Sequence, residues 1–508
     1  MSFSLPDYQN GSKPYRGSRL VNDIAARPLH TYPHPAKNTL KVFDRRIGLG
    51  AVAFCALHIP LGILLYRYSA LATLHGLAVF AIGAWWAVSG RRNLLRVACV
   101  GAYIAGVEVL WRMAQAETYW EFGKYAIATI FLLAILRTSR LRPPFLILCY
   151  FVLLLPSAAL TFISVDATQF KATLSFNMSG PLALMVSVWF FSRLKLSTRQ
   201  LQRLFVALIG PALGVASITI FSIASSSNIN FAGGSNVVTS GGFGPNQVSA
   251  TLGLGVLIAF LLILIEKTDW KIKIFMLGGL LFLAVQSALT FSRGGLYNAA
   301  GGAAIASLYL IRDPRSRLKF LFLAVVLFVS TNYFLLPRLD AFTEGALSAR
   351  FKSTSTTGRD RIAMTEIQVW LNNPVFGVGP GRTPGNVAHT EFTRLLSEHG
   401  TFGLLSILVL TIAGARNIRR APTIKNKALA ASMMGWSFLF MLNAGMRLAA
   451  PAFAFGLAFI TLLPEEYRGR NFNRPRKFGR IPRQSANSRT TVIAGPDKET
   501  EKFAQSNN

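Results

Sequence analysis

A series of long apolar stretches recurs from about residue 47 to about residue 463, and this feature most constrains the fold. Crossing the hydrocarbon core of a bilayer takes about 20 apolar residues in a helix. Stretches such as 145–162 and 318–336 approach or reach that length. Backbone groups in lipid must bond within their own segment, so helices are expected. With only 15% charged residues, the sequence excludes a water-soluble domain and predicts an all-α polytopic membrane protein.

Counting the apolar stretches predicts about fourteen transmembrane helices. They begin near residues 47, 71, 95, 122, 143, 178, 203, 247, 274, 295, 319, 402, 428 and 449. Lys and Arg gather in alternate loops between these stretches. Because basic loops stay on the cytoplasmic side, this alternation predicts that both termini are cytoplasmic.

This predicted membrane topology divides the chain into three regions. Residues 1–46 are expected to be a basic cytoplasmic tail, 47–463 the transmembrane domain, and 464–508 a basic, disordered cytoplasmic tail. The longest loop on the outer side, 337–401, precedes the last three spans and is expected to hold short amphipathic helices. Any extramembrane chemistry is expected on that side.

The formal net charge of +32 could suggest nucleic-acid binding. The basic residues, however, lie in short clusters between apolar stretches and in the tails, as membrane topology requires. No nucleic-acid partner is therefore expected. The three cysteines lie in apolar segments without metal-ligand spacing, which indicates packing.

Four cations near the predicted outer face are not explained by the positive-inside rule. These are Arg112, Lys124, Arg293 and Arg447. A cation at this level can neutralise a lipid phosphate or pyrophosphate. Alternatively, each side chain extends to the interface or pairs with a nearby carboxylate, such as Glu108, Glu117 or Glu121.

Three short motifs carry further candidates. Ser292-Arg293-Gly294-Gly295 joins two apolar spans, and its arginine offers a rigid fork suited to a pyrophosphate. Gly358-Arg359-Asp360-Arg361 opens a stretch with helical spacing that ends at Asn373-Pro374. The turn Phe376-Gly377-Val378-Gly379-Pro380-Gly381 could cradle a phosphate, but its spacing favours a structural turn.

His389 heads a further segment with apolar residues at helical spacing. A neutral histidine can take a proton from an attacking hydroxyl, so His389 is a candidate general base. The set His389, Glu391 and His399 does not have the ligand spacing of zinc motifs, so no metal is expected.

The order of these motifs resembles the O-antigen ligase and polymerase superfamily. The resemblance spans about residues 240–405, from Gly241-Gly242-Phe243-Gly244-Pro245-Asn246-Gln247 through the two arginine motifs to His389 and Glu398-His399-Gly400. Thr390 departs from the family pattern, in which Asn commonly follows the histidine.

The resemblance implies a glycosyltransferase of the bacterial inner membrane that acts at the periplasmic face. Its donor would be a glycan on undecaprenyl pyrophosphate, its acceptor a glycan or a lipid-linked sugar, and other polysaccharide-assembly proteins would be further partners. The family pattern assigns the pyrophosphate to Arg293 and Arg359 and the acceptor proton to His389, with no cofactor and no metal.

Second-tier candidates for pyrophosphate or glycan contact are chosen by topology: Arg112, Lys124, Arg361 and Arg447. Tyr119, Trp120 and Trp370 could stack on sugar rings or anchor the chain at the interface. Two activities stay open, polymerisation of lipid-linked repeats and ligation of a finished glycan, with a slight preference for the first. Alternatives from other classes are a lipid-linked saccharide flippase and a non-enzymatic scaffold.

Overall fold

The computed structural model describes residues 39–90, 93–137, 141–164, 166–231, 234–265, 270–355, 358–383 and 390–463. The predicted C-terminal tail lies outside the described residues, as does the predicted N-terminal tail up to residue 38. The first helix, α1, begins at Thr39 and therefore extends into the predicted tail.

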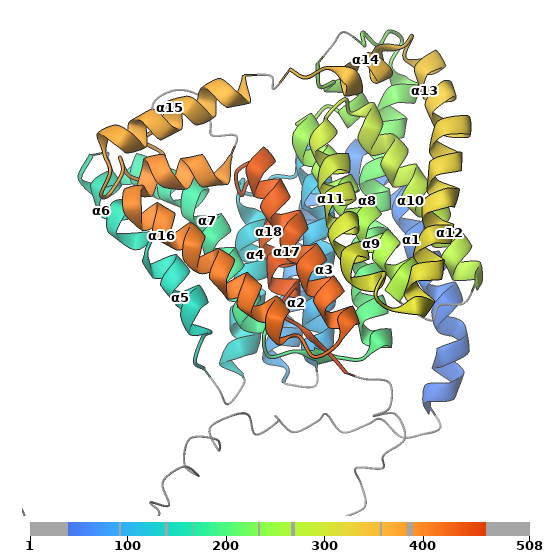
Figure 1. The fold of residues 1–508 in the computed structure, drawn as a ribbon, viewed down its shortest axis with the longest axis horizontal. Helices are drawn as coiled ribbons and strands as arrows, with labels where there is room; N and C mark the ends of the chain where they lie inside the picture. The colour runs from blue at the N-terminus through green and yellow to red at the C-terminus, as the bar shows by residue number, and fades with distance from the viewer. Residues whose placement is uncertain are drawn as a thin grey trace, which may run out of the picture. The chain divides into compact units, whose positions relative to one another are not determined.

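The described part of the chain is almost entirely helical, as predicted. Figure 1 shows the helices side by side in a bundle, with α14 and α15 at one end. In chain order the helices are α1 (Thr39–Arg67), α2 (Ser69–Val88), α3 (Leu94–Met113), α4 (Phe122–Leu136), α5 (Phe145–Val152), α6 (Leu155–Ser164), α7 (Ala167–Phe191), α8 (Thr198–Ser225), η2 (Val238–Ser240), α9 (Pro245–Ile265), α10 (Trp270–Leu289), α11 (Arg293–Leu310), α12 (Pro314–Val329), η3 (Ser330–Leu335), α13 (Leu336–Phe342), α14 (Ala346–Lys352), α15 (Arg359–Asn372), α16 (Glu391–Arg420), α17 (Ile424–Asn443) and α18 (Ala449–Leu457).

Two very short strands are the described exceptions to the helical fold. β1 (Lys195–Leu196) pairs in parallel with β2 (Thr461–Leu462), so that Lys195 lies opposite Thr461. The pairing ties the connection between α7 and α8 to the segment that follows α18.

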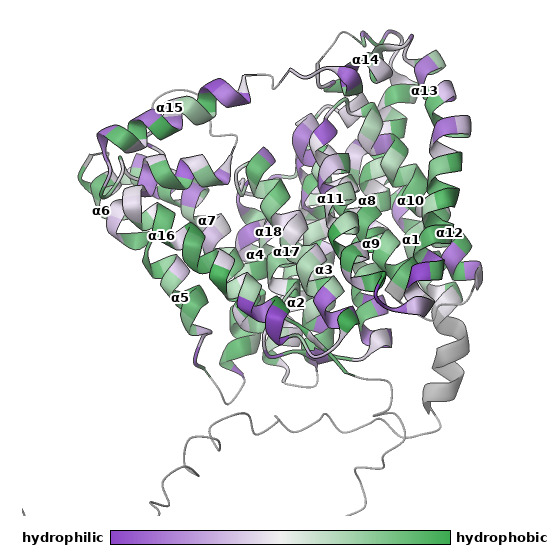
Figure 2. Cartoon of the chain, in the orientation of Figure 1, coloured by the Kyte–Doolittle hydropathy of each residue, from purple (hydrophilic) through white to green (hydrophobic). Residues whose placement is uncertain are grey.

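Ten helical segments of the described chain are long and apolar enough to cross a membrane. Figure 2 shows hydrophobic residues along most of their length and hydrophilic residues toward the helix ends. Four predicted spans do not reach that standard: α4 and α18 are short, and α11 and α17 are not apolar enough. All nine residues of α18 are buried in protein, so this helix needs no lipid-facing apolar surface.

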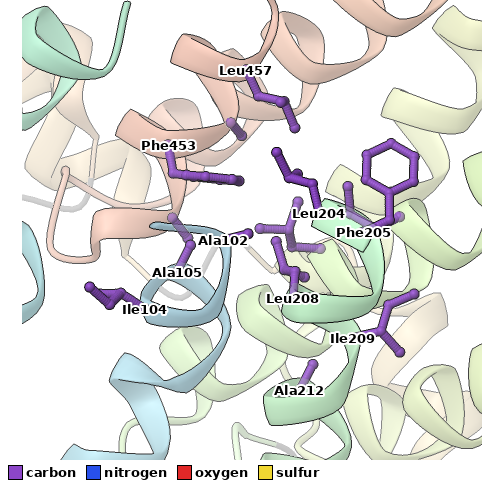
Figure 3. Close-up of a cluster of buried hydrophobic side chains, with 14 of the residues drawn as sticks. Ala102, Ile104, Ala105, Leu204, Phe205, Leu208, Ile209, Ala212, Phe453 and Leu457 are labelled. Carbon is purple, nitrogen blue, oxygen red and sulfur yellow. The ribbon is translucent and has the colours of Figure 1, made fainter. Parts of the chain in front are cut away.

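One part of the hydrophobic core lies where α3, α8 and α18 meet (Figure 3). Ala102 and Ala105 of α3 face Leu204 and Leu208 of α8, while Phe453 of α18 closes the cluster. Small alanines let the helix backbones approach closely, and the large side chains fill the space between them. Packing of this kind holds the bundle together where lipid gives no hydrophobic drive for helix association.

The helices extend into both ends of the loop predicted at 337–401. At its start, α12 continues through the π-helical segment η3 into α13 and ends at Phe342. Pro337 lies just after the π-helical segment and does not end the helix. At the far end, α16 already begins at Glu391 and bends at Gly400, whose φ of 60° is left-handed. The connection between the two long helices contains α14 and α15.

Candidate functional site

Three helix starts and one helix end meet at the end of the bundle that carries α14 and α15, which we call the α15 end (Figure 1). Asn246 lies at the start of α9, Arg293 begins α11, Arg359 begins α15 and Asn443 ends α17. A small pocket that opens to solvent lies beside them. Its lining is Asn246, Ala250, Ser292, Gly294, Asn298, Arg359, Phe440, Asn443 and Ala444.

Close packing of α11 on α9 brings Arg293 and Asn246 to the same place. A Cβ atom on Gly295 would lie 1.9 Å from the carbonyl oxygen of Ser249, so only glycine allows this approach. Ser249 donates from its hydroxyl to the Ser292 carbonyl at 2.7 Å, and Ser292 donates to Asn246 Oδ1 at 2.8 Å. These contacts hold the turn that begins α11, and with it the Cα of Arg293.

The guanidinium of Arg293 binds the backbone of the segment that leads toward α15. Its Nη2 donates to the Ser355 carbonyl at 2.6 Å, and its Nη1 donates to the carbonyl of Ser353. Arg350 of α14 lies beside it and donates from Nε to the Phe291 carbonyl at 3.2 Å. Arg293 therefore anchors the segment before Arg359 as well as contributing charge.

Arg359 has a different environment, because its side chain lines the pocket. Its described hydrogen-bond partner is Asn443, whose Oδ1 accepts from Nη1 at 3.5 Å. Asn443 in turn donates from Nδ2 to Asn298 Oδ1 at 2.9 Å. The pocket thus offers a half-buried guanidinium flanked by amide side chains.

The arginines form a cluster of positive charge. Burial, followed by the neighbouring charges of Arg293 and Arg350, lowers the pKa of Arg359 below its usual value. Burial and then Arg293 lower the pKa of Arg350 in the same way. The described residues that line the pocket include no carboxylate. Such a cluster is unfavourable by itself and is stabilised by an anion with several oxygens, as in a phosphate or pyrophosphate.

Arg447 belongs to the same electrostatic neighbourhood. Burial lowers its pKa first, and the charges of Arg394 and Arg359 lower it further, against an opposing effect of Glu391. The loop that carries Arg447 is held by buried charged side chains on both flanks. Glu391 Oε2 accepts from the Met446 amide at 2.9 Å, and Glu108 Oε2 accepts from the Ala449 amide at 2.6 Å.

Arg112 and Lys124 are largely buried and occupied by protein partners. Arg112 pairs with Glu108 at 2.7 Å, which is one of the alternatives that the sequence leaves open. Lys124 pairs with Glu121 and donates to the Met446 carbonyl at 3.0 Å. Lys124 therefore contacts the loop that carries Arg447.

The remaining predicted residues are one arginine, two tryptophans and one histidine. Arg361 is exposed on α15, which occupies the predicted position for a helix after Gly358. Trp120 is half-exposed and Trp370 is partly buried. His389 lies outside the described residues, and Thr390, the residue after it, caps α16 by accepting from the Thr393 amide at 3.3 Å.

The glycine-rich turn after α15 has a structural role. Gly377 has a φ of 66°, and a Cβ there would lie 2.5 Å from the carbonyl oxygen of Ser397. The turn bonds to α16 through the amides of Val378 and Gly379, which donate at 2.9 and 3.0 Å to the carbonyls of Ser397 and Glu398. The turn thus packs against the bend of α16 and does not line the pocket described above.

Several residues of the site were not singled out from the sequence. Arg394 forms buried ion pairs with Glu391 and Glu398. Their spacing of three and four residues on one helix could have indicated these pairs from the sequence. Arg350 lies in the loop between two named motifs. Asn298 and Asn443 are 145 residues apart, and no local pattern predicts that they meet.

Part of this chain is similar to a known protein family. Residues 278–408 match the family model described as O-antigen ligase, which confirms the predicted resemblance. No curated protein matches the sequence. The matched segment contains Arg293, Arg350, Arg359 and the start of α16. It indicates a multi-pass membrane protein of polysaccharide assembly, of the O-antigen ligase or polymerase type.

Proposed function

We propose that this chain, whose residues 278–408 form an O-antigen ligase domain, is a glycosyltransferase. It transfers a glycan from undecaprenyl pyrophosphate to an acceptor sugar hydroxyl. The observation that carries the proposal is the convergence of Arg293, Arg350 and Arg359 beside a pocket without a described carboxylate. An immobile cationic pocket suits a leaving group that gains negative charge as its bond to the sugar breaks.

The pyrophosphate of the donor binds to Arg359 in this proposal. Its guanidinium has donors available, while Asn298 and Asn443 provide further amide groups at the rim. Arg293 contributes charge and keeps the preceding segment in place. Arg447, whose pKa is lowered by the charge of Arg359, adds a further cation nearby, and Arg361 is a candidate for contact with the glycan.

The reaction is a single displacement at the anomeric carbon. The acceptor oxygen attacks that carbon, the bond from the carbon to the pyrophosphate oxygen breaks, and the electron pair leaves with undecaprenyl pyrophosphate. His389 takes the proton of the acceptor hydroxyl. Attack opposite the leaving group inverts the configuration of the anomeric carbon. Each step uses side chains of this chain, without a metal or a nucleotide sugar.

We further propose that the chain crosses the bacterial inner membrane fourteen times, with both termini in the cytoplasm. Basic residues at the far ends of α11 and α16, such as Arg312 and Arg420, support this orientation. The α15 end then faces the periplasm. A lipid-linked glycan presents its pyrophosphate at that membrane surface, level with Arg359.

Polymerase and ligase use the same chemistry and differ in their acceptor. We favour the polymerase slightly, because the outer face must accommodate two lipid-linked glycans. A flippase would need its phosphate-binding cations in a cavity at mid-membrane. The cluster of Arg293, Arg350 and Arg359 at one end of the bundle supports transfer over transport.

The test is a size analysis of surface and lipid-linked glycans from cells that lack this chain. Single lipid-linked repeats without long chains would identify a polymerase. Long chains still on the carrier would identify a ligase. Complementation with His389→Ala or Arg359→Ala should fail, whereas Arg338→Ala, an exposed cation of α13, should restore output. Wild-type output from normally inserted His389→Ala and Arg359→Ala proteins would contradict catalysis.

A further inference from the structure

Two aromatic side chains from distant parts of the chain come together near the first turn of α9. Trp120 lies in the loop between α3 and α4, and Phe243 lies just before α9. Their ring centroids are 6.1 Å apart and the rings are tilted by 45°. Half of Trp120 is exposed. Neither ring belongs to the matched family segment.

Arg112 holds Trp120 in one orientation. Its Cζ lies 4.7 Å from the centroid of the indole ring, and its Nη2 donates to the Trp120 carbonyl at 3.0 Å. The same guanidinium is paired with the buried Glu108 at 2.7 Å. A cation therefore covers one side of the indole, while half of the side chain stays exposed.

The first turn of α9 connects this aromatic pair to the pocket. Gln247 Oε1 accepts from Arg112 Nη1 at 2.8 Å. The residue before it, Asn246, lines the pocket and accepts from Ser292. Adjacent residues of one helical turn thus contact the anion pocket and the guanidinium that supports Trp120.

We propose that Trp120, Phe243, Arg112 and Gln247, together the Trp120 platform, bind a pyranose ring of the glycan. A large rigid aromatic face packs against the apolar C–H face of a sugar, while the amide beside it can bond to the hydroxyl groups. Gln247 of the platform directly follows Asn246 of the pocket, so a glycan attached to a pyrophosphate in the pocket can reach the platform. This inference rests on the proposed function.

Both substrates of the proposed reaction contain pyranose rings. The ring on the platform belongs either to the donor glycan or to the acceptor glycan. Separate KM measurements distinguish these two sources, because each substrate can be varied while the other is saturating.

An interfacial membrane anchor is the alternative role for an exposed tryptophan. The chain offers a matched control for it. Trp270 begins α10 at the opposite end of the bundle, is 63% exposed, and has Lys271 Nζ 5.9 Å from its ring centroid. A general anchoring effect would appear equally when either tryptophan is replaced.

The experiment uses the full chain in nanodiscs, with lipid-linked glycan purified from cells that lack the chain as the donor and the native glycan as the acceptor. Trp120→Ala should raise one KM about three- to tenfold with little change in kcat. Trp120→Phe, which keeps a flat ring, should stay within about twofold of wild type. Trp270→Ala should leave both KM values unchanged.

A rise in the donor KM assigns the ring to the donor, and a rise in the acceptor KM assigns it to the acceptor. Unchanged KM values for Trp120→Ala, or an equal change for Trp270→Ala, would overturn the platform. If Arg359→Ala still abolishes transfer in that case, the proposed function stands without it. If no lipid-linked glycan is transferred by the wild-type protein, the proposed function itself fails.

Discussion

Replacing Arg359 by lysine keeps the positive charge and removes the planar fork. The structure leaves Arg359 one described hydrogen-bond partner, Asn443 at a long 3.5 Å, so the remaining donors are available to the pyrophosphate. A charge-assisted hydrogen bond contributes about 1.5–3 kcal/mol. Losing one such bond in the transition state lowers kcat/KM by about 10- to about 150-fold, because each 1.36 kcal/mol is about a factor of ten.

The alanine variant loses the positive charge and both hydrogen-bond donors of the fork, so its kcat/KM should fall by at least about 150-fold. Initial rates of glycan transfer in membranes from cells lacking the wild-type chain measure both effects, after normalisation to inserted protein. The control is Arg338→Ala on α13, whose side chain is exposed. Rates for Arg359→Lys within threefold of wild type would refute a bidentate contact to the leaving group.

Two further predictions follow from packing and from a buried carboxyl group. Gly295→Ala should abolish stable insertion or activity, because the new Cβ would lie 1.9 Å from the Ser249 carbonyl oxygen. Gly279→Ala should be tolerated, because a Cβ at that position has no atom within 4 Å. Equal expression and activity of both variants would contradict the close approach of α9 and α11. Burial raises the pKa of Glu366 in α15 above its usual value, so stability falls as pH rises from about 4.5 through the higher folded-state pKa. Glu366→Gln removes this loss of stability, so the difference in thermal unfolding temperature between the variant and the wild type should grow in favour of the variant from pH 4 to pH 8. A difference independent of pH would show that ionisation of Glu366 does not affect stability.

The sequence predicted the helices well because membrane helices obey a simple length requirement. Helices begin at, or run through, positions within two residues of every predicted start. The number of spans was harder to predict, since α18 is short and buried entirely by protein. Polar residues continue α13 and α16 beyond the apolar stretches, so hydropathy alone does not give the ends of these helices.

The candidate site was predictable where it depends on local motifs. Glycines after Arg293 and before Arg359 indicated both arginines as candidates. Arg359 lines the pocket, and Arg293 lies close enough to lower the pKa of Arg359. The network of Asn298 and Asn443 depends on the packing of α11 against α17, which no local pattern encodes. The pairing of Arg112 with Glu108 was visible in the spacing of four residues, but the spacing alone did not exclude a ligand.

The central claim is that this chain breaks a glycosyl–pyrophosphate bond at the α15 end. Its most direct test is the release of undecaprenyl pyrophosphate from purified lipid-linked glycan by the purified chain. We expect one carrier pyrophosphate for each new glycosidic bond with the wild-type protein, and almost none with Arg359→Ala. Movement of intact lipid-linked glycan across a vesicle membrane without carrier release would contradict the account and indicate a transporter.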